Sequence, residues 1–146
     1  MAQLNGGLLP VAAHLLLFPV VAALPAPPWA RAAGYGWLVI DIATDIMALN
    51  GVASTIYLPM KYGGYVSAAL WIASSSWQVK GATRLVGLLL ALDLGVYSFI
   101  PRGSFFVLLP SGLLFPIWFW LVGRLLTRKG DYQQGRVEGG EQQVPS

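Results

Sequence analysis

Long apolar runs, separated by short segments of proline, glycine and basic residues, fill the chain up to residue 126. A transmembrane helix needs about 20 apolar residues to cross about 30 Å of hydrocarbon. The pattern therefore predicts five membrane-spanning helices, at about 8–24, 35–58, 65–79, 85–100 and 105–126. The third and fourth runs are short for a full span, so four spans with one re-entrant segment form the alternative.

The two ends of the chain differ in composition. No Lys or Arg precedes the first apolar run, whereas a secretory signal peptide opens with a positively charged region, so we expect this run to be a retained helix. The segment 127–146 is polar and rich in Gly and Gln, and such a segment buries too little apolar surface to fold. We expect an all-α protein with one transmembrane helical domain, 1–126, and a disordered cytoplasmic tail, 127–146.

Composition supports a membrane protein and narrows its chemistry. Of the residues, 56% are hydrophobic and 10% are charged, whereas a typical soluble domain has about 25% charged residues. The chain has no cysteine and one histidine, which excludes disulfides, thiolate metal sites and histidine-rich metal sites. No cofactor or metal is predicted. The net charge of +3 is small and the basic residues adjoin apolar runs, so the expected partner is a lipid bilayer and not a nucleic acid.

Basic residues are distributed unequally between the two sides of the predicted five-span bundle. One side carries Lys61 and Arg102. The other side carries Arg31, Lys80, Arg84, Arg124, Arg128, Lys129 and Arg136. Because cytoplasmic segments are enriched in Lys and Arg, this bias predicts an N-terminus outside and a C-terminus in the cytoplasm, in the inner (plasma) membrane of the cell.

Acidic residues inside the predicted spans are Asp41, Asp45 and Asp93. An ionised carboxylate at the bilayer centre costs roughly 2.5–3.5 kcal/mol, so each must face inward, find a partner or be protonated. Counted from the cytoplasmic ends at about 1.5 Å per residue, Asp41 lies about 9 Å deep, and Asp45, Asp93 and His14 lie about 12–15 Å deep. The sequence thus predicts a buried polar site just on the cytoplasmic side of the bilayer centre, formed by Asp45, Asp93, Asp41, His14, Tyr97 and Ser75. Replacing Asp45 or Asp93 by Asn is expected to have a larger effect than replacing Asp41.

Small residues recur at every fourth position of the fourth run, at Gly87, Ala91 and Gly95. Such a series allows close approach of a neighbouring helix. We expect a helix-packing face here, which serves either the bundle itself, a homo-oligomer or a larger membrane complex.

Several functions are compatible with this pattern. The aspartates could be structural, paired across helices by hydrogen bonds that contribute about 0.6 kcal/mol each in membranes. The most concrete functional hypothesis is proton-coupled transport of a small molecule or ion, because an intramembrane acid can exchange a proton. The alternatives are a membrane enzyme using aspartate acid–base chemistry on a lipid or isoprenoid, and an accessory subunit of a membrane complex. A metal site of Asp41, Asp45 and His14 is disfavoured because the chain has a single histidine and no cysteine.

Overall fold

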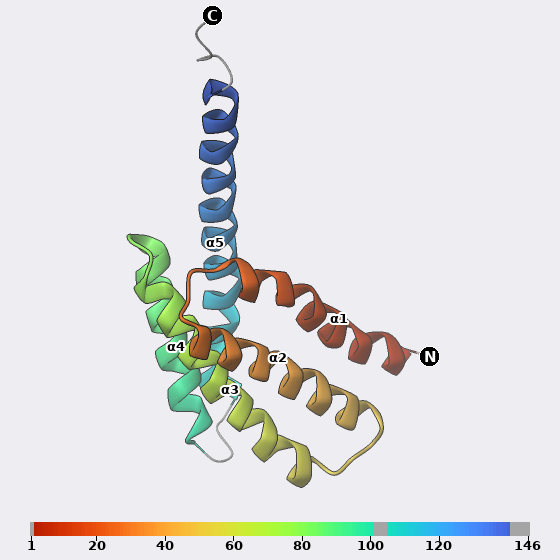
Figure 1. The fold of residues 1–146 in the computed structure, drawn as a ribbon. Coiled ribbons are helices and arrows are strands. Elements are labelled where there is room, and N and C mark those ends of the chain that lie inside the picture. Colours follow the sequence, from red (N-terminus) through yellow and green to blue (C-terminus); the bar gives the residue numbers. More distant parts are fainter. Residues whose placement is uncertain (1, 101–104, 141–146) are drawn as a thin grey trace, which may run out of the picture.

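The chain folds as five helices, α1 to α5 (Figure 1). A computed structural model describes the backbone of residues 2–100 and 105–140 and the side chains of residues 8–100 and 109–127, and these ranges contain no strand. The helices are α1 Ala2–Ala23, α2 Pro28–Leu49, α3 Ser54–Trp77, α4 Ala82–Ser98 and α5 Phe105–Gly140. The predicted all-α fold class is confirmed.

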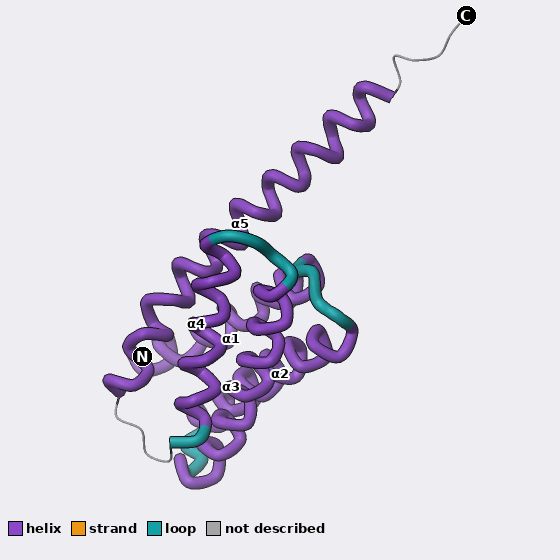
Figure 2. Tube along the Cα trace, turned by 90° about the vertical axis from the view of Figure 1, so that its left-hand side faces the viewer, coloured by secondary structure: helices purple, strands orange, loops and turns teal. Residues whose placement is uncertain are grey.

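Each helix packs against the next one along the chain. The connections are short, and consecutive helices run back and forth through a single bundle (Figure 2). Helix α3 packs against both α2 and α4, and α5 packs against α4 and then continues beyond the other helices (Figure 1). Because α1 and α5 do not pack along each other, the bundle is open between these two helices.

Helix α2 lies earlier in the chain than the predicted span 35–58. Pro27 is its N-cap and Pro28 is its first residue, a position where the fixed φ of proline favours the helix and the missing N–H is not needed. The helix ends at Leu49, and the turn that follows contains Gly51 with φ +73°, a conformation that glycine adopts without strain. The region 35–58 is therefore the end of one helix, a turn and the start of the next.

Helix α3 is longer than the predicted span 65–79. It begins at Ser54 and continues through Pro59, so its length is 24 residues. This length exceeds the about 20 residues needed for a span, so the argument for a re-entrant third segment no longer holds. Helix α5 continues to Gly140, into the segment predicted to be a disordered tail, and residues 141–146 lie outside the described residues. Disorder of this tail stays a prediction.

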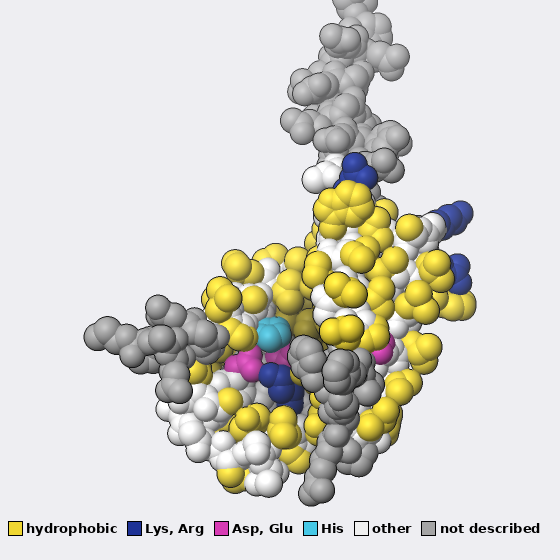
Figure 3. Space-filling view, turned by 180° about the vertical axis from the view of Figure 1, so that it is seen from behind, with side chains coloured by type: hydrophobic (Ala, Val, Ile, Leu, Met, Phe, Trp, Pro, Cys, Tyr) yellow, Lys and Arg dark blue, Asp and Glu magenta, His cyan; other side chains and the backbone are white. Residues whose placement is uncertain are grey.

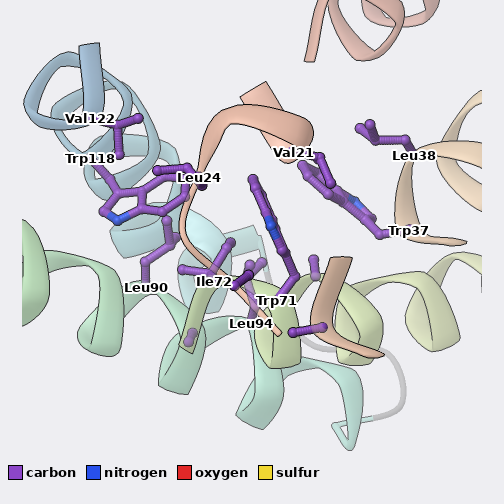
Figure 4. Close-up of a cluster of buried hydrophobic side chains, with 14 residues drawn as sticks. Val21, Leu24, Trp37, Leu38, Trp71, Ile72, Leu90, Leu94, Trp118 and Val122 are labelled. Carbon is purple, nitrogen blue, oxygen red and sulfur yellow. The ribbon is translucent and has the colours of Figure 1, made fainter. Parts of the chain in front are cut away.

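All five helices contribute to one apolar core with Trp71 of α3 at its centre (Figure 4). The Trp71 ring stacks on Trp37 of α2 at a centroid distance of 5.8 Å and meets the edge of Trp118 of α5 at 5.5 Å. The surrounding fully or nearly fully buried side chains are Val21, Leu24, Leu38, Ile72, Leu90, Leu94 and Val122. The indole N–H groups of Trp37 and Trp118 both donate hydrogen bonds, so these rings carry polar links as well as apolar contact.

The predicted packing face on α4 is filled by neighbouring helices of the same chain. A methyl group at Gly87 would overlap the Ser76 hydroxyl of α3, which accepts a hydrogen bond of 3.1 Å from the Trp118 indole of α5. Ala91 is buried, and Gly95 faces Ala69 of α3 at ordinary contact distance. Gly87 thus marks the point where α3, α4 and α5 meet, and it is not available to a partner chain.

Two helical segments are long and apolar enough to cross a membrane: Pro28–Leu49, with mean hydropathy 1.3, and Leu109–Thr127, with mean hydropathy 1.4. A shorter apolar helical segment covers Leu8–Ala23. Length and composition do not by themselves establish a five-span membrane bundle.

Candidate functional site at the junction of three helices

A cluster of charged and ionisable side chains joins α1, α2 and α3. His14 of α1 lies between two aspartates of α2, with Nε2 3.2 Å from Asp41 Oδ2 and Nδ1 3.5 Å from Asp45 Oδ2. Lys61 of α3 donates a hydrogen bond of 2.7 Å to Asp45 Oδ1. We call these four residues the His14 cluster. It carries a net charge of −1 when the imidazole is neutral and 0 when it is protonated.

Helical spacing explains the two contacts on α2. Positions four residues apart share a helix face, so Trp37, Asp41 and Asp45 project in the same direction. The Trp37 indole donates a hydrogen bond of 2.6 Å to Asp41 Oδ2, and its ring meets the His14 ring edge-on at a centroid distance of 5.8 Å. Since Trp37 also stacks on Trp71, the cluster is attached directly to the apolar core.

Each aspartate of the cluster uses one carboxylate oxygen and leaves the other without a hydrogen bond. Asp41 Oδ1 and Asp45 Oδ2 are buried and unpartnered among the described residues, and so is His14 Nδ1. Buried polar atoms normally have a hydrogen-bond partner. Two of these unpartnered atoms, Asp45 Oδ2 and His14 Nδ1, face one another across 3.5 Å. The arrangement therefore contains a position where a proton would satisfy both atoms.

A pocket of about 430 Å³ adjoins the cluster. Its polar edge is formed by the His14 cluster and Tyr65, and its walls are formed by the apolar side chains of Pro10, Leu17, Trp37, Phe115, Pro116 and Phe119. The apolar walls come from α1, α2 and α5, and the pocket lies where α1 and α5 do not pack together. Figure 3 shows histidine, acidic and basic side chains gathered in a hollow on one face of the bundle. The volume falls within the about 300–1,000 Å³ typical of small-molecule sites.

The structure brings together only part of the predicted site. Asp41, Asp45 and His14 meet, whereas Asp93 of α4 accepts a hydrogen bond from Ser111 of α5 and lies outside the cluster. Of the three aspartates only Asp41 is buried, at 2% exposure, and the other two are half-buried. The predicted set of buried aspartates is therefore shown for Asp41 alone.

Tyr97 and Ser75 also lie outside the cluster. The Tyr97 ring packs against Tyr62 and Tyr65 at centroid distances of 5.7 and 5.9 Å. Ser75 is buried, and its hydroxyl donates to the Trp71 carbonyl of its own helix at 2.8 Å. Ser75 therefore satisfies its hydrogen bond locally and provides no donor to the cluster.

The predicted depth of the site needs correction because α2 begins seven residues before Tyr35, at Pro28. Asp41 lies about 20 Å from that end of a helix about 33 Å long. The cluster is therefore past the midpoint of α2, nearer to the α2–α3 turn than to the end that carries Arg31. The sequence analysis had placed the cluster on the other side of the bilayer centre, the side that carries Arg31.

Lys61, Trp37 and Tyr65 are site residues that the sequence analysis missed. Lys61 was assigned to a segment between two spans, and no role in the site was predicted for Trp37 or Tyr65. The Asn50–Gly51 pair is a turn signal, and ending the second helix there would have moved Lys61 into the next helix, close to Asp45. The described residues contain no group of three or more His, Asp or Glu side chains placed to hold a metal ion.

The fold and this site define a class of protein: an all-helical chain with two helices able to cross a membrane and a polar cluster beside an apolar pocket. Comparison with protein-family models, curated proteins and solved structures found no match to this chain. The function must therefore be argued from the site itself.

Proposed function

We propose that this chain is a five-span membrane protein that binds and releases a proton between His14 and Asp45, and that it uses this step for proton-coupled transport of a small molecule or ion. The observation that carries the proposal is the pair of unpartnered atoms, His14 Nδ1 and Asp45 Oδ2, facing one another beside the pocket.

The apolar surface of the bundle supports a membrane location. In a soluble protein, a helix that is apolar all round is covered by the rest of the fold. Only 28% of the apolar segment of α2 and 17% of that of α5 are buried. Large side chains such as Leu9, Leu16 and Leu113 are 72%, 75% and 65% exposed. Exposed apolar surface on this scale is suited to contact with lipid.

The positions of the basic residues support the proposed orientation. Lys61 lies within α3 and pairs with Asp45, so it no longer counts as a loop residue on the outer side. Arg31 and Lys80 are exposed near the helix ends on the opposite side, and Arg102 lies outside the described residues. This distribution supports the proposed orientation, with the N-terminus outside and the C-terminus in the cytoplasm.

The proton step follows from the chemistry of imidazole. A neutral histidine carries one proton, and with this proton on Nε2, facing Asp41, the Nδ1 lone pair faces an Asp45 oxygen with no hydrogen between them. A second proton on Nδ1 converts this contact into a hydrogen bond. The net charge of the His14 cluster then changes from −1 to 0. Because a charge interacts more strongly with its surroundings in a partly buried site than in water, this change alters the affinity of the pocket for a charged solute.

The test is proton movement across vesicles that contain the purified full-length chain. A pH gradient is imposed, internal pH is followed with a dye, and one solute class is added at a time: alkali metal ions, organic ammonium ions or carboxylates. We expect at least one class to accelerate proton movement through the wild-type chain. His14→Gln, which cannot carry the second proton, is expected to reduce this acceleration at least about a hundredfold, the lower end of the contribution typical of a single proton-transfer group.

Asp93→Asn is the matched control, because it also removes an aspartate from the bundle but leaves the His14 cluster intact. It is expected to retain the wild-type rate. Proton movement that is insensitive to every solute class, in a chain shown to be folded, would contradict the transport proposal.

A second candidate function is a membrane enzyme acting on a lipid or isoprenoid. The observation that favours it is the position of the pocket, on the side of the bundle between α1 and α5, with the apolar walls of Leu17, Phe115 and Phe119. A substrate could enter from the acyl chains, with Asp41 or Asp45 as acid or base. Conversion of lipids in these vesicles, lost in both Asp41→Asn and Asp45→Asn, would favour this function over transport.

A further inference from the structure

A second, more polar pocket lies at the opposite end of the bundle from the α2–α3 turn. It has a volume of about 250 Å³ and is lined by Lys80, Ala82, Thr83, Leu121, Arg124 and Leu125. Its residues come from the α3–α4 connection, the first turn of α4 and the neighbouring face of α5. It shares no residue with the pocket beside the His14 cluster.

Three sources of positive potential converge on this second pocket. Lys80 and Arg124 supply full charges, and neither forms a salt bridge within the described part of the chain. The third source is the N-terminus of α4, a helix of 17 residues. Its N-cap residue is Gly81, which makes no side-chain cap. The first N–H groups of a helix have no partner within the helix and bind anions when no side chain caps them.

Thr83 is a further polar group at the same place. Its side chain is only 8% exposed, yet it lines the pocket. Its hydroxyl makes no hydrogen bond with any described residue, and its oxygen is not fully buried, so it keeps access to the pocket. A free hydroxyl donor that opens on the pocket, beside two basic side chains and an uncapped helix N-terminus, suits a ligand with oxygen acceptors.

Nearby aromatic side chains place this pocket at the level of lipid headgroups. The Arg124 guanidinium lies 4.5 Å over the ring of Trp120, and the Arg84 guanidinium lies 4.1 Å over the ring of Trp77. Trp120 and Trp77 are 59% and 64% exposed. Exposed tryptophan beside basic residues is typical of the boundary between membrane and water. The end of the bundle that carries this pocket is also the end with the excess of basic residues.

We propose that this second pocket binds a phosphate group, held by Lys80, Arg124, the Thr83 hydroxyl and the first N–H groups of α4. The phosphate can belong to the headgroup of an anionic phospholipid or to a soluble phosphate. The site shares no residue with the His14 cluster and does not depend on transport, whereas a lipid headgroup as its ligand rests on the proposed membrane location.

The test is a binding measurement on the full-length chain in bilayer discs. Thermal unfolding is compared in discs of phosphatidylcholine alone, in discs that also contain phosphatidylglycerol, and in phosphatidylcholine discs with added inorganic phosphate. A ligand that binds only the folded chain raises its unfolding temperature. We expect phosphatidylglycerol, inorganic phosphate or both to do so. Lys80→Gln, Arg124→Gln and Thr83→Val are each expected to weaken binding, by about tenfold for the two charged residues.

Arg31→Gln is the matched control, since it removes one positive charge from an exposed residue that does not line the pocket. It is expected to keep the stabilisation. A response to phosphatidylglycerol alone supports a lipid headgroup as the source of the phosphate, and a response to inorganic phosphate supports a soluble source. The proposal would be overturned if Arg31→Gln and Arg124→Gln lost the same amount of ligand-induced stabilisation while Thr83→Val lost none. That result would show only a general attraction between surface charges. No stabilisation by either ligand would overturn the proposal as well.

Discussion

Asp41→Ala is expected to lower the free energy of unfolding by about 3 kcal/mol, several times the about 0.6 kcal/mol of an average hydrogen bond in a membrane. Asp41 is the most buried acid of the described residues, and one of its oxygens lies close to both the Trp37 indole and His14. Removal of the Asp41 carboxylate leaves the buried Trp37 indole N–H without an acceptor. His14 then has Asp45 as its only neighbouring carboxylate among the described residues. Equilibrium unfolding in mixed lipid–detergent micelles measures the change.

Asp93→Ala is the control for the Asp41 prediction. From the sequence we expected replacement of Asp93 to have a larger effect than replacement of Asp41, and we now expect the opposite order because Asp93 lies outside the His14 cluster. Asp93 is half-buried and its hydrogen bond to Ser111 has no further link to the described charges, so its loss should cost about 1 kcal/mol. Asp41→Asn removes the charge but keeps the shape of the side chain, and its amide oxygen still accepts the hydrogen bond from Trp37. Its loss in free energy of unfolding is expected to lie between those of the two alanine variants. Equal costs for Asp41→Ala and Asp93→Ala would contradict the assignment of Asp41 as the anchor of the site.

Gly87→Ala is expected to destabilise the fold by about 2–3 kcal/mol, the upper part of the range for overpacking of a core. The added methyl group overlaps the Ser76 hydroxyl, so α3 and α4 must move apart or Ser76 must turn away from Trp118. Either change breaks the hydrogen bond between α3 and α5. The same unfolding measurement reports the cost, and an altered tryptophan fluorescence reports the displacement of Trp118.

Gly95→Ala is the matched control for Gly87→Ala, since both glycines belong to α4 and to the same repeat of small residues. A methyl group at Gly95 meets Ala69 at 4.0 Å, which is ordinary contact. We expect Gly95→Ala to change the free energy of unfolding by less than about 0.5 kcal/mol. If the two substitutions had the same effect, the close packing of three helices at Gly87 would be refuted.

The helical fold class followed from the sequence because long apolar runs and a low fraction of charged residues are properties of local composition. The first and last residues of the helices were predicted less accurately, because a proline can either end a helix or stand in its first turn. Pro28 begins α2 and Pro59 lies inside α3, whereas segments containing proline were expected to separate the helices. A proline is tolerated in the first turn because the N–H that it lacks is not needed there. This rule accounts for Pro28, but Pro59 is the sixth residue of α3 and lies beyond the first turn, so the rule does not apply to it.

The composition of the candidate site was predictable only for residues on one helix. Spacing of four residues put Asp41 and Asp45 on one face, and that relation holds. The meeting of His14 with them, and the separation of Asp93, depend on how helices rotate about their axes. Rotation is set by the packing of Trp37, Trp71 and Trp118 in the core. No pattern within a single helix encodes these contacts between helices.

Magnetic resonance of isotope-labelled histidine in lipid bilayers, recorded from acidic to alkaline pH, tests the proton site most directly, because the chain contains a single histidine. We expect neutral His14 to carry its proton on Nε2, and we expect Nδ1 to gain a proton as the pH is lowered. We also expect Asp45→Asn to change the midpoint of this titration and Asp93→Asn to leave it unchanged. A neutral ring protonated on Nδ1, or a titration that is identical in the wild type and Asp45→Asn, would contradict the account.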